Sequence, residues 1–378
     1  MPLRGDYGVY SVTRGSNINM DRRLDALSSL SPTYGHSTFL SALGDKVMTT
    51  LSGVTSSNRG THIDSAQLAR RWRCSLETAK RTLQRTTQRA IRDHTGIVGG
   101  RKLRATHYQL RYRRLHCEVY TDTYIGPCRS LLGNTCCQVY ATKFQWSRAY
   151  PMSSNDGLQA SYTLQKLFRK IGFPQALIPD SAMNLTKGKF LHTAQKAQVP
   201  IHAVEPYMHN LALAEDAIRE ALRLHRRIML ARNVPKVLWD CCFVYCCEIR
   251  SLMALGHHEQ DGDCGTTIIQ GFTADISHVA EFGFYDWCWA WSPKESNQEH
   301  MQLGRWCGPS WDIGDQLCFA ILTANGQILH RSSVFPLSAD ERNSEEIQEM
   351  KRRFTTKLEN ELGDRMKGID PIEIDDFG

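Results

Sequence analysis

The sequence lacks any long uninterrupted apolar run. No stretch approaches the roughly 18–20 residues that a transmembrane helix needs, and residues 1–6 carry no apolar segment typical of a secretory signal. These absences predict an intracellular protein with no membrane partner. The 378 residues, 41 % hydrophobic and 22 % charged, are enough for two or three domains with packed cores.

Clear zinc-site and disulfide patterns are also missing, although cysteine itself is abundant. The chain has 13 cysteines, and adjacent pairs occur at 136–137, 241–242 and 246–247, each inside an apolar run. Because a free cysteine behaves as a small buried hydrophobe, this arrangement favours core packing over metal binding.

Acidic residues are nearly absent between Thr61 and Leu115. Only Asp64, Glu77 and Asp93 stand there against 14 Lys and Arg residues, so the local excess of +11 is larger than the net charge of +7 for the whole chain. Lysines and arginines that neutralise phosphates release counterions, so the excess favours a nucleic-acid partner over a merely solvated basic face.

Two short helices are predicted in this basic region. Asp64 can cap a first helix that carries Trp72, and Ser75 can cap a second helix that carries Leu83 and Ile91. Two short helices joined by a tight turn are typical of a helix-turn-helix. We therefore assign residues 61–112 to a basic helical domain, preceded by a flexible segment at 1–60 that is rich in Ser, Thr and Gly.

From 113 to 258 the pattern changes to α/β. Three short strands in a meander are followed by alternating helices and strands, which predicts a mixed sheet with helices on both faces. The expected strands are 117–124, 135–142, 144–150, 176–179 and 201–204, and the expected helices are 157–171, 189–198, 212–232 and 235–255.

The remaining residues predict a small β-rich module and a tail. The module covers 265–340, and its expected strands are 282–291, 317–322 and 328–335. The tail covers 341–378 and is expected to form one exposed helix followed by a disordered acidic end.

Three carboxylates stand at positions suited to metal chemistry. Asp122 lies inside the first strand, Asp180 directly follows the strand at 176–179, and Glu215 lies in the first turns of the helix at 212–232. An ionised Asp in an apolar strand is costly to bury unless a cation compensates it. Magnesium prefers oxygen ligands, so the pattern predicts a carboxylate–metal cluster, although Asp180 could instead simply cap a helix.

The residues around these carboxylates resemble the integrases of copia- and gypsy-type LTR retrotransposons. The resemblance covers about residues 62–340. It is carried by the segments Tyr120–Tyr124, Ser130–Val139, Tyr150–Met152, Asn233–Asp240, Thr273–Ser277, Glu281–Asp286 and Leu303–Trp306.

This resemblance implies an RNase H-like core with a five-stranded mixed sheet and a D,D-35-E triad. The triad falls on Asp122, Asp180 and Glu215, with 57 and 34 intervening residues, and Asp216 is the alternative third ligand. It would bind Mg²⁺ or Mn²⁺, with two ions expected. The implied activity is phosphodiester cleavage and strand transfer by a Pol-encoded homo-oligomer on DNA ends in the nucleus, with no small-molecule substrate.

The chain also departs from the family at two places. The Gln and Asn expected before the triad Glu fall on Leu211 and Ala212, and no HxxxH…CxxC zinc module precedes the core. The alternative is therefore a catalytically inactive DNA-binding remnant of an integrase. Under both interpretations the expected DNA contacts are Arg70, Arg71, Lys80, Arg81, Arg85 and Arg89 in the helical domain, and Arg219, Arg223, Arg226 and Arg227 on the Glu215 helix; an exposed cationic helix that contacts nothing is the plainer alternative.

Overall fold

The computed structural model describes residues 62–88, 114–180, 183–202, 213–256, 262–291, 301–311, 313 and 318–366. All of them belong to one compact unit, Gly60–Gly378. The predictions for residues 1–60, for Arg89 and Ile91, for Leu211 and Ala212, and for the end of the tail lie outside the described residues. None of the described helices is long and apolar enough to cross a membrane.

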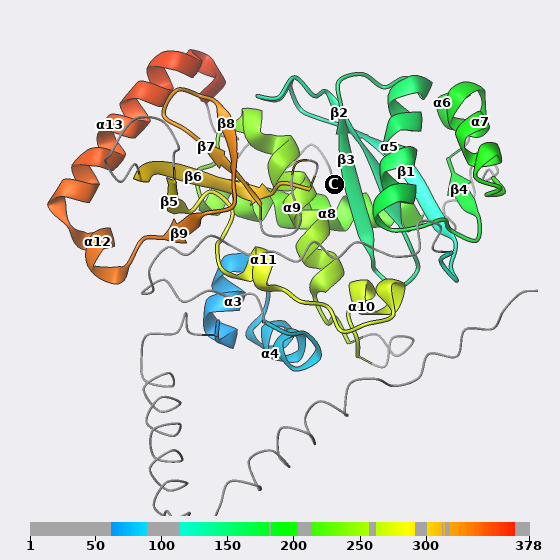
Figure 1. The fold of residues 1–378 in the computed structure, drawn as a ribbon, viewed down its shortest axis with the longest axis horizontal. Coiled ribbons are helices and arrows are strands. Elements are labelled where there is room, and N and C mark those ends of the chain that lie inside the picture. Colours follow the sequence, from blue (N-terminus) through cyan, green and yellow to red (C-terminus); the bar gives the residue numbers. More distant parts are fainter. Residues whose placement is uncertain are drawn as a thin grey trace, which may run out of the picture. The chain divides into compact units, whose positions relative to one another are not determined.

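The two predicted helices of the basic region are α3 (Ser65–Trp72) and α4 (Leu76–Arg85). Both predicted caps are confirmed: the Asp64 carboxylate accepts from the Gln67 N–H at 2.7 Å, and the Ser75 hydroxyl accepts from the Thr78 N–H at 3.1 Å. The Trp72 ring N–H donates to the Val279 carbonyl at 3.0 Å. This bond ties α3 to α11 (Ser277–Ala280), and the two helices lie side by side in Figure 1.

The central sheet contains four strands in the order β3-β2-β1-β4 (Figure 1). β1 (Val119–Ile125), β2 (Cys136–Ala141) and β3 (Ser147–Met152) form an antiparallel meander, and β4 (Leu177–Pro179) runs parallel to β1. Ile201 continues the sheet through a parallel bridge to Leu177, at the start of the predicted fifth strand. This is the RNase H-like α/β fold expected from the sequence, but with four strands and a single bridge at Ile201 where five strands were predicted; residues 203 and 204 lie outside the described residues.

Helices cover both faces of this sheet. Successive side chains of a strand point to opposite faces of the sheet. Because β2 is buried along its whole length, both of its faces are covered. Tyr140 packs in the cluster that contains Leu164, whereas Val139 packs in the cluster that contains Ala221 and Phe243. The first layer comprises α5 (Gly157–Lys170), α6 (Met183–Thr186) and α7 (Gly188–Lys196), and the second comprises α8 (Leu213–Ala231), η2 (Lys236–Leu238) and α9 (Trp239–Leu252).

The cysteine pairs lie in these cores. Cys136 and Cys137 on β2 are fully buried, as are Cys246 and Cys247 on α9. The prediction that cysteine serves as core packing is therefore confirmed for these positions.

A second sheet follows α10 (Gly265–Gln270) and α11, with the antiparallel order β8-β7-β6-β5-β9. Its central strand, residues 301–309, was not predicted. This strand contains Gly304, where a Cβ would lie 2.4 Å from Cγ2 of Ile321, so glycine is needed for the two neighbouring strands to approach. The predicted strand 328–335 is in fact two strands at opposite edges. The strands are β5 (Trp287–Trp291), β6 (Met301–Pro309), β7 (Phe319–Leu322), β8 (Ile328–Arg331) and β9 (Val334–Pro336).

The tail forms α12 (Ala339–Asn343), α13 (Glu345–Leu362) and η4 (Gly363–Met366). The expectation of an exposed helix is wrong for α13, because Phe354 and Leu358 are only 6 % and 1 % exposed. Phe354 packs edge-on against Trp287, with ring centroids 5.0 Å apart. One continuous core therefore joins α3, α9, the second sheet and α13.

Candidate functional site

Asp122 lies in the middle of β1, on the side of the sheet that faces α8. Its register partner on β2 is Val139, and residues that pair directly in an antiparallel ladder share a face. Val139 packs against Ile218 and Ala221 of α8. The sequence-predicted first carboxylate is therefore held by a central strand beneath this helix.

Asp180 is brought beside Asp122 by the parallel pairing of β1 with β4. Thr121 pairs with Pro179, and the Asp180 N–H donates to the Thr121 carbonyl at 3.2 Å, which continues the ladder past the end of β4. The next step of the register sets Asp180 opposite Asp122. Asp180 is exposed at the strand end.

Glu215 comes from the first turn of α8. This helix contacts both β1 and β2, with Ala214 and Ile218 buried and Glu215 exposed. The alternative third ligand, Asp216, is engaged in an ion pair with Arg219 on the same helix. The structure therefore favours Glu215 over Asp216 as the carboxylate available to the other two.

The three carboxylates share one electrostatic neighbourhood. Burial raises the pKa of Asp122, and the negative charges of Asp180 and Glu215 raise it further, while the Thr123 N–H that donates to Asp122 Oδ1 at 2.6 Å opposes this. Each of these carboxylates would be stabilised in its charged form by a cation placed among them.

The donor chemistry of this set suits a divalent metal, because hard cations such as Mg²⁺ take carboxylate oxygens. Across the described ranges, however, no three His, Cys, Asp or Glu side chains are arranged so that they could already hold an ion. Asp122, Asp180 and Glu215 are thus neighbours with suitable ligand atoms rather than a formed metal centre.

A buried amide binds the side chains of the two threonines that flank Asp122 and was not singled out in the sequence. Gln138 on β2 is fully buried; its Nε2 donates to Thr121 Oγ1 at 2.7 Å, and its Oε1 accepts from Thr123 Oγ1 at 2.9 Å. Gln138 therefore grips the residues on both sides of Asp122. The Thr-Asp-Thr alternation opposite a Gln was the available signal.

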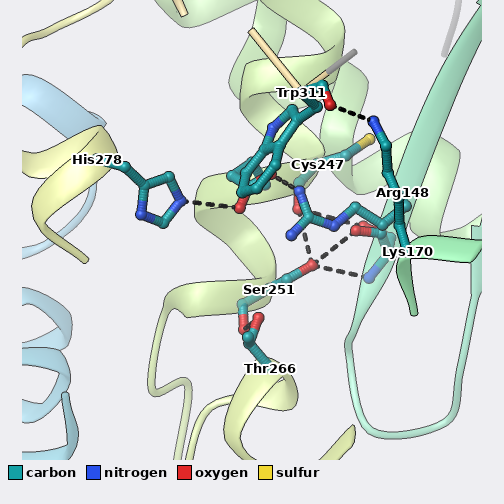
Figure 2. Close-up of polar contacts among 9 residues, drawn as sticks. Arg148, Lys170, Cys247, Ser251, Thr266, His278 and Trp311 are labelled. Atoms are coloured by element: carbon teal, nitrogen blue, oxygen red, sulfur yellow. Dashed lines mark hydrogen bonds and ion pairs between the residues drawn. The ribbon is translucent and has the colours of Figure 1, made fainter. Parts of the chain in front are cut away.

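A second buried polar cluster, shown in Figure 2, lies between β3, α9 and α11. His278 Nε2 lies 3.1 Å from Glu248 Oε1, and Glu248 also forms an ion pair with Arg148. Arg148 in turn lies over the Trp311 ring, 4.9 Å from its centroid, and Lys170 donates to the Trp311 carbonyl at 2.6 Å. The cluster ties the first sheet to the segment that leads into the second sheet.

This cluster lacks the arrangement of a nucleophilic site. Burial and the charge of Arg148 lower the pKa of His278 to about 3, so the ring is neutral. The Ser251 hydroxyl lies 2.8 Å from the carbonyl oxygens of Ser147 and Cys247. Ser251, labelled in Figure 2, is thus hydrogen-bonded to backbone carbonyls rather than to His278, so we interpret the cluster as structural.

The predicted DNA-contacting residues of the helical pair are divided. Arg70, Lys80 and Arg85 are exposed, although Arg85 lies 3.4 Å from Asp263. Arg71 is partly buried and donates to the Ala280 carbonyl at 2.5 Å. Arg81 lies 3.8 Å from Glu77. The exposed cations on this pair remain available to a polyanion.

The predicted basic stripe on α8 is largely neutralised within the helix. Arg219 pairs with Asp216, and Arg223 pairs with Glu220 at 2.5 Å. Arg226 is partly buried, and its charge acts on Tyr124. Arg227 is exposed and donates to the Arg223 carbonyl at 3.4 Å. The stripe is therefore a weaker cationic surface than its sequence indicated.

The sequence matches no protein-family model and no curated protein. Among solved structures, 42 % of the chain is similar to 99 % of the HTLV-2 integrase catalytic core domain, described in complex with magnesium in a trimeric form, with 12 % identity and a TM-score of 0.33. Likewise, 41 % of the chain is similar to 93 % of the BIV integrase catalytic core domain, with 11 % identity and a TM-score of 0.31.

Proposed function

We propose that this chain is a retroelement integrase of the copia or gypsy type that cleaves and joins DNA with a divalent metal. The observation that carries the proposal is the placement of Asp122 on β1 beneath α8, with the Asp180 N–H bonded to the Thr121 carbonyl and Glu215 in the first turn of α8. Strand, strand end and helix each contribute one carboxylate, as the sequence pattern predicts. The proposed partners are DNA and further copies of the chain, and the proposed location is the nucleus.

In this proposal Asp122, Asp180 and Glu215 hold Mg²⁺ or Mn²⁺. Bound there, such ions would supply Lewis-acid activation of the attacking oxygen and neutralise charge on the phosphate. The protein's part is positioning: Gln138 holds the hydroxyls of Thr121 and Thr123 on both sides of Asp122, and the exposed Asp180 and Glu215 face the solvent from which DNA arrives. This chemistry would form no covalent intermediate with the protein.

The alternative is a DNA-binding remnant without catalysis. It is favoured by the absence of a formed metal-holding group among the residues that the structure describes, and by Leu211 and Ala212 at positions where the family has amides. Both candidates use the exposed cations of the helical pair, so DNA binding alone does not distinguish them.

Nicking of supercoiled plasmid with Mn²⁺, measured beside duplex binding, tests the proposal. We expect nicking by the unsubstituted chain and its loss in Asp122→Asn and Glu215→Gln, with unchanged DNA binding. Asp216→Asn is the matched control, since it removes the same charge from the neighbouring residue and should keep activity. Binding without any nicking would support the remnant instead, and loss in Asp216→Asn with retention in Glu215→Gln would reassign the third ligand.

A further inference from the structure

A cationic hollow lies between α3, the segment that leads into β5, and the helices of the tail. Its volume is about 480 Å³, within the roughly 300–1,000 Å³ of typical small-molecule pockets. Its apolar lining comprises Phe282, Trp287, Pro336 and Leu337. We call this feature the arginine hollow, and its cationic residues are Arg70, Arg71, Arg73, Arg232, Arg342 and Lys351.

The positive charge of the arginine hollow is not balanced by its acidic residues. Only Glu281 and Asp286 are among the lining residues. Asp286 is already engaged, because it forms an ion pair with Arg232 and accepts from the Gly283 N–H at 2.7 Å. Arg305 adds further positive charge nearby, stacked 3.5 Å from the centroid of the Trp287 ring.

The cations of the hollow repel one another. Burial lowers the pKa of Arg71; Arg342 and Arg70 lower it further, while Tyr245 and Glu281 oppose them. Burial likewise lowers the pKa of Lys351, with Arg305 and Arg342 adding to the effect. Such repulsion persists only at a cost that a bound anion would remove.

One guanidinium of the hollow also has an unused donor. Arg73 follows α3 in the left-handed conformation, with φ of 52°, and its Nε is buried without a hydrogen-bond partner. Buried donors of native proteins are nearly always paired, so an orphaned one beside a hollow calls for an acceptor. Phosphate oxygens match the fork of guanidinium donors.

We propose that the arginine hollow binds a compact polyphosphorylated small molecule. The cations converge on one concave space from α3, the end of α8, α12 and α13, rather than following one helix as a nucleic-acid stripe would. Four of the lining residues are apolar, which suits a small ligand body. This inference does not depend on the carboxylate site, and it adds a ligand class where the sequence predicted none.

Inositol hexakisphosphate is the probe for the test, titrated into the full chain by calorimetry in EDTA so that metal at the carboxylates cannot contribute. We expect one molecule bound per chain and a higher melting temperature. Each of Arg342→Gln and Lys351→Gln should weaken binding about tenfold or more, since each removes a charge-assisted contact. Lys357→Gln on the same helix is the matched control, because Lys357 is exposed and outside the hollow.

Three outcomes would overturn the proposal: no saturable binding at millimolar probe, equal weakening by Lys357→Gln, or displacement of the probe by a short DNA duplex whose own affinity depends equally on Lys351. The last would assign the hollow to nucleic acid. Inorganic triphosphate and ATP serve as further arms that separate simple phosphate chains from the inositol scaffold. Asp122→Asn should bind the probe unchanged, which keeps this result separate from the integrase proposal.

Discussion

Replacing Asp122 by Asn should stabilise the metal-free protein while abolishing its response to metal. Asp122 stands opposite Asp180 in the sheet register and is coupled to Glu215. Cross-strand side-chain pairs are worth roughly 0.2–1 kcal/mol, and like charges directly opposite one another are destabilising, so relieving the Asp122–Asp180 repulsion should contribute up to about 1 kcal/mol. For the unit Gly60–Gly378, that corresponds to about 1.5 °C in melting temperature. The Thr123 N–H can still donate to the Asn oxygen, so the strand keeps its local hydrogen bond.

Metal should reverse this order of stability. A ligand at 100 times its Kd stabilises the folded state by about 2.7 kcal/mol, so Mg²⁺ should raise the melting temperature of the unsubstituted chain above that of Asp122→Asn. The pH dependence follows the same carboxyl: because the folded-state pKa is raised from 3.8, stability falls as pH rises through the folded pKa. Asp122→Asn should not show this decrease in stability with rising pH.

The assay is thermal unfolding in EDTA and across a Mg²⁺ titration, with Asp216→Asn as the control. Asp216 carries the same charge but is paired with Arg219, so its substitution should destabilise slightly and leave the metal response intact. If Asp122→Asn melts below the unsubstituted chain in EDTA, or if Mg²⁺ shifts both equally, the three carboxylates do not form the proposed site.

Three further substitutions test the packing that positions the site. Because the pKa of His278 is lowered from 6.5 to about 3, the unfolding free energy should decrease by up to about 1.4 kcal/mol for each unit that the pH falls below 6.5. From pH 7 to 4.5, the urea midpoint should therefore decrease less steeply in His278→Gln than in the unsubstituted chain. Equal slopes would contradict this. Gly304→Ala should cost about 1–3 kcal/mol by overpacking against Ile321, measured by urea unfolding, and an unchanged midpoint would show that β6 and β7 can separate. Phe354→Ala should cost about 3–5 kcal/mol; a loss below 1 kcal/mol would mean that α13 does not belong to the core.

Much of the helical pair and of the first sheet follows from local sequence signals. Asp64 and Ser75 mark helix starts through their side-chain oxygens, and both caps are present. β1 and β3 begin and end within three residues of the predicted bounds. These elements were predictable because their capping and periodicity are set by neighbouring residues.

β6 was missed because its burial does not alternate. Residues on both sides of Gly304 are buried in runs, and the register shifts between Trp306 and Pro309. A bulged strand buried on both faces loses the period of two that identifies a strand. The burial of α13 was hidden for a different reason: Ile347, Phe354 and Leu358 form a sparse apolar stripe among many charges.

The net positive charge that α8 presents depends on ion pairs within the helix, which a count of its arginines does not include. Arg219 and Arg223 each lie three residues after an acidic partner on α8, a spacing that favours ion pairs on a helix. Counting only the arginines made α8 seem strongly cationic. The elements that carry the three carboxylates were predictable from the sequence, but the exposure of Glu215 and the ion pair of Asp216 required the structure.

The basic excess of the helical region therefore does not form a single surface. α3 contributes Arg70 and Arg71 to the arginine hollow, where they meet Arg342 and Lys351 from the far end of the chain. On α4, Lys80 and Arg85 are exposed. A polyanion that approaches the helical pair from solvent would meet the exposed Arg70 as well as Lys80 and Arg85, whereas Arg71 is partly buried and lines the hollow. One run of arginines in sequence therefore contributes both to an exposed cationic surface and to the lining of the hollow.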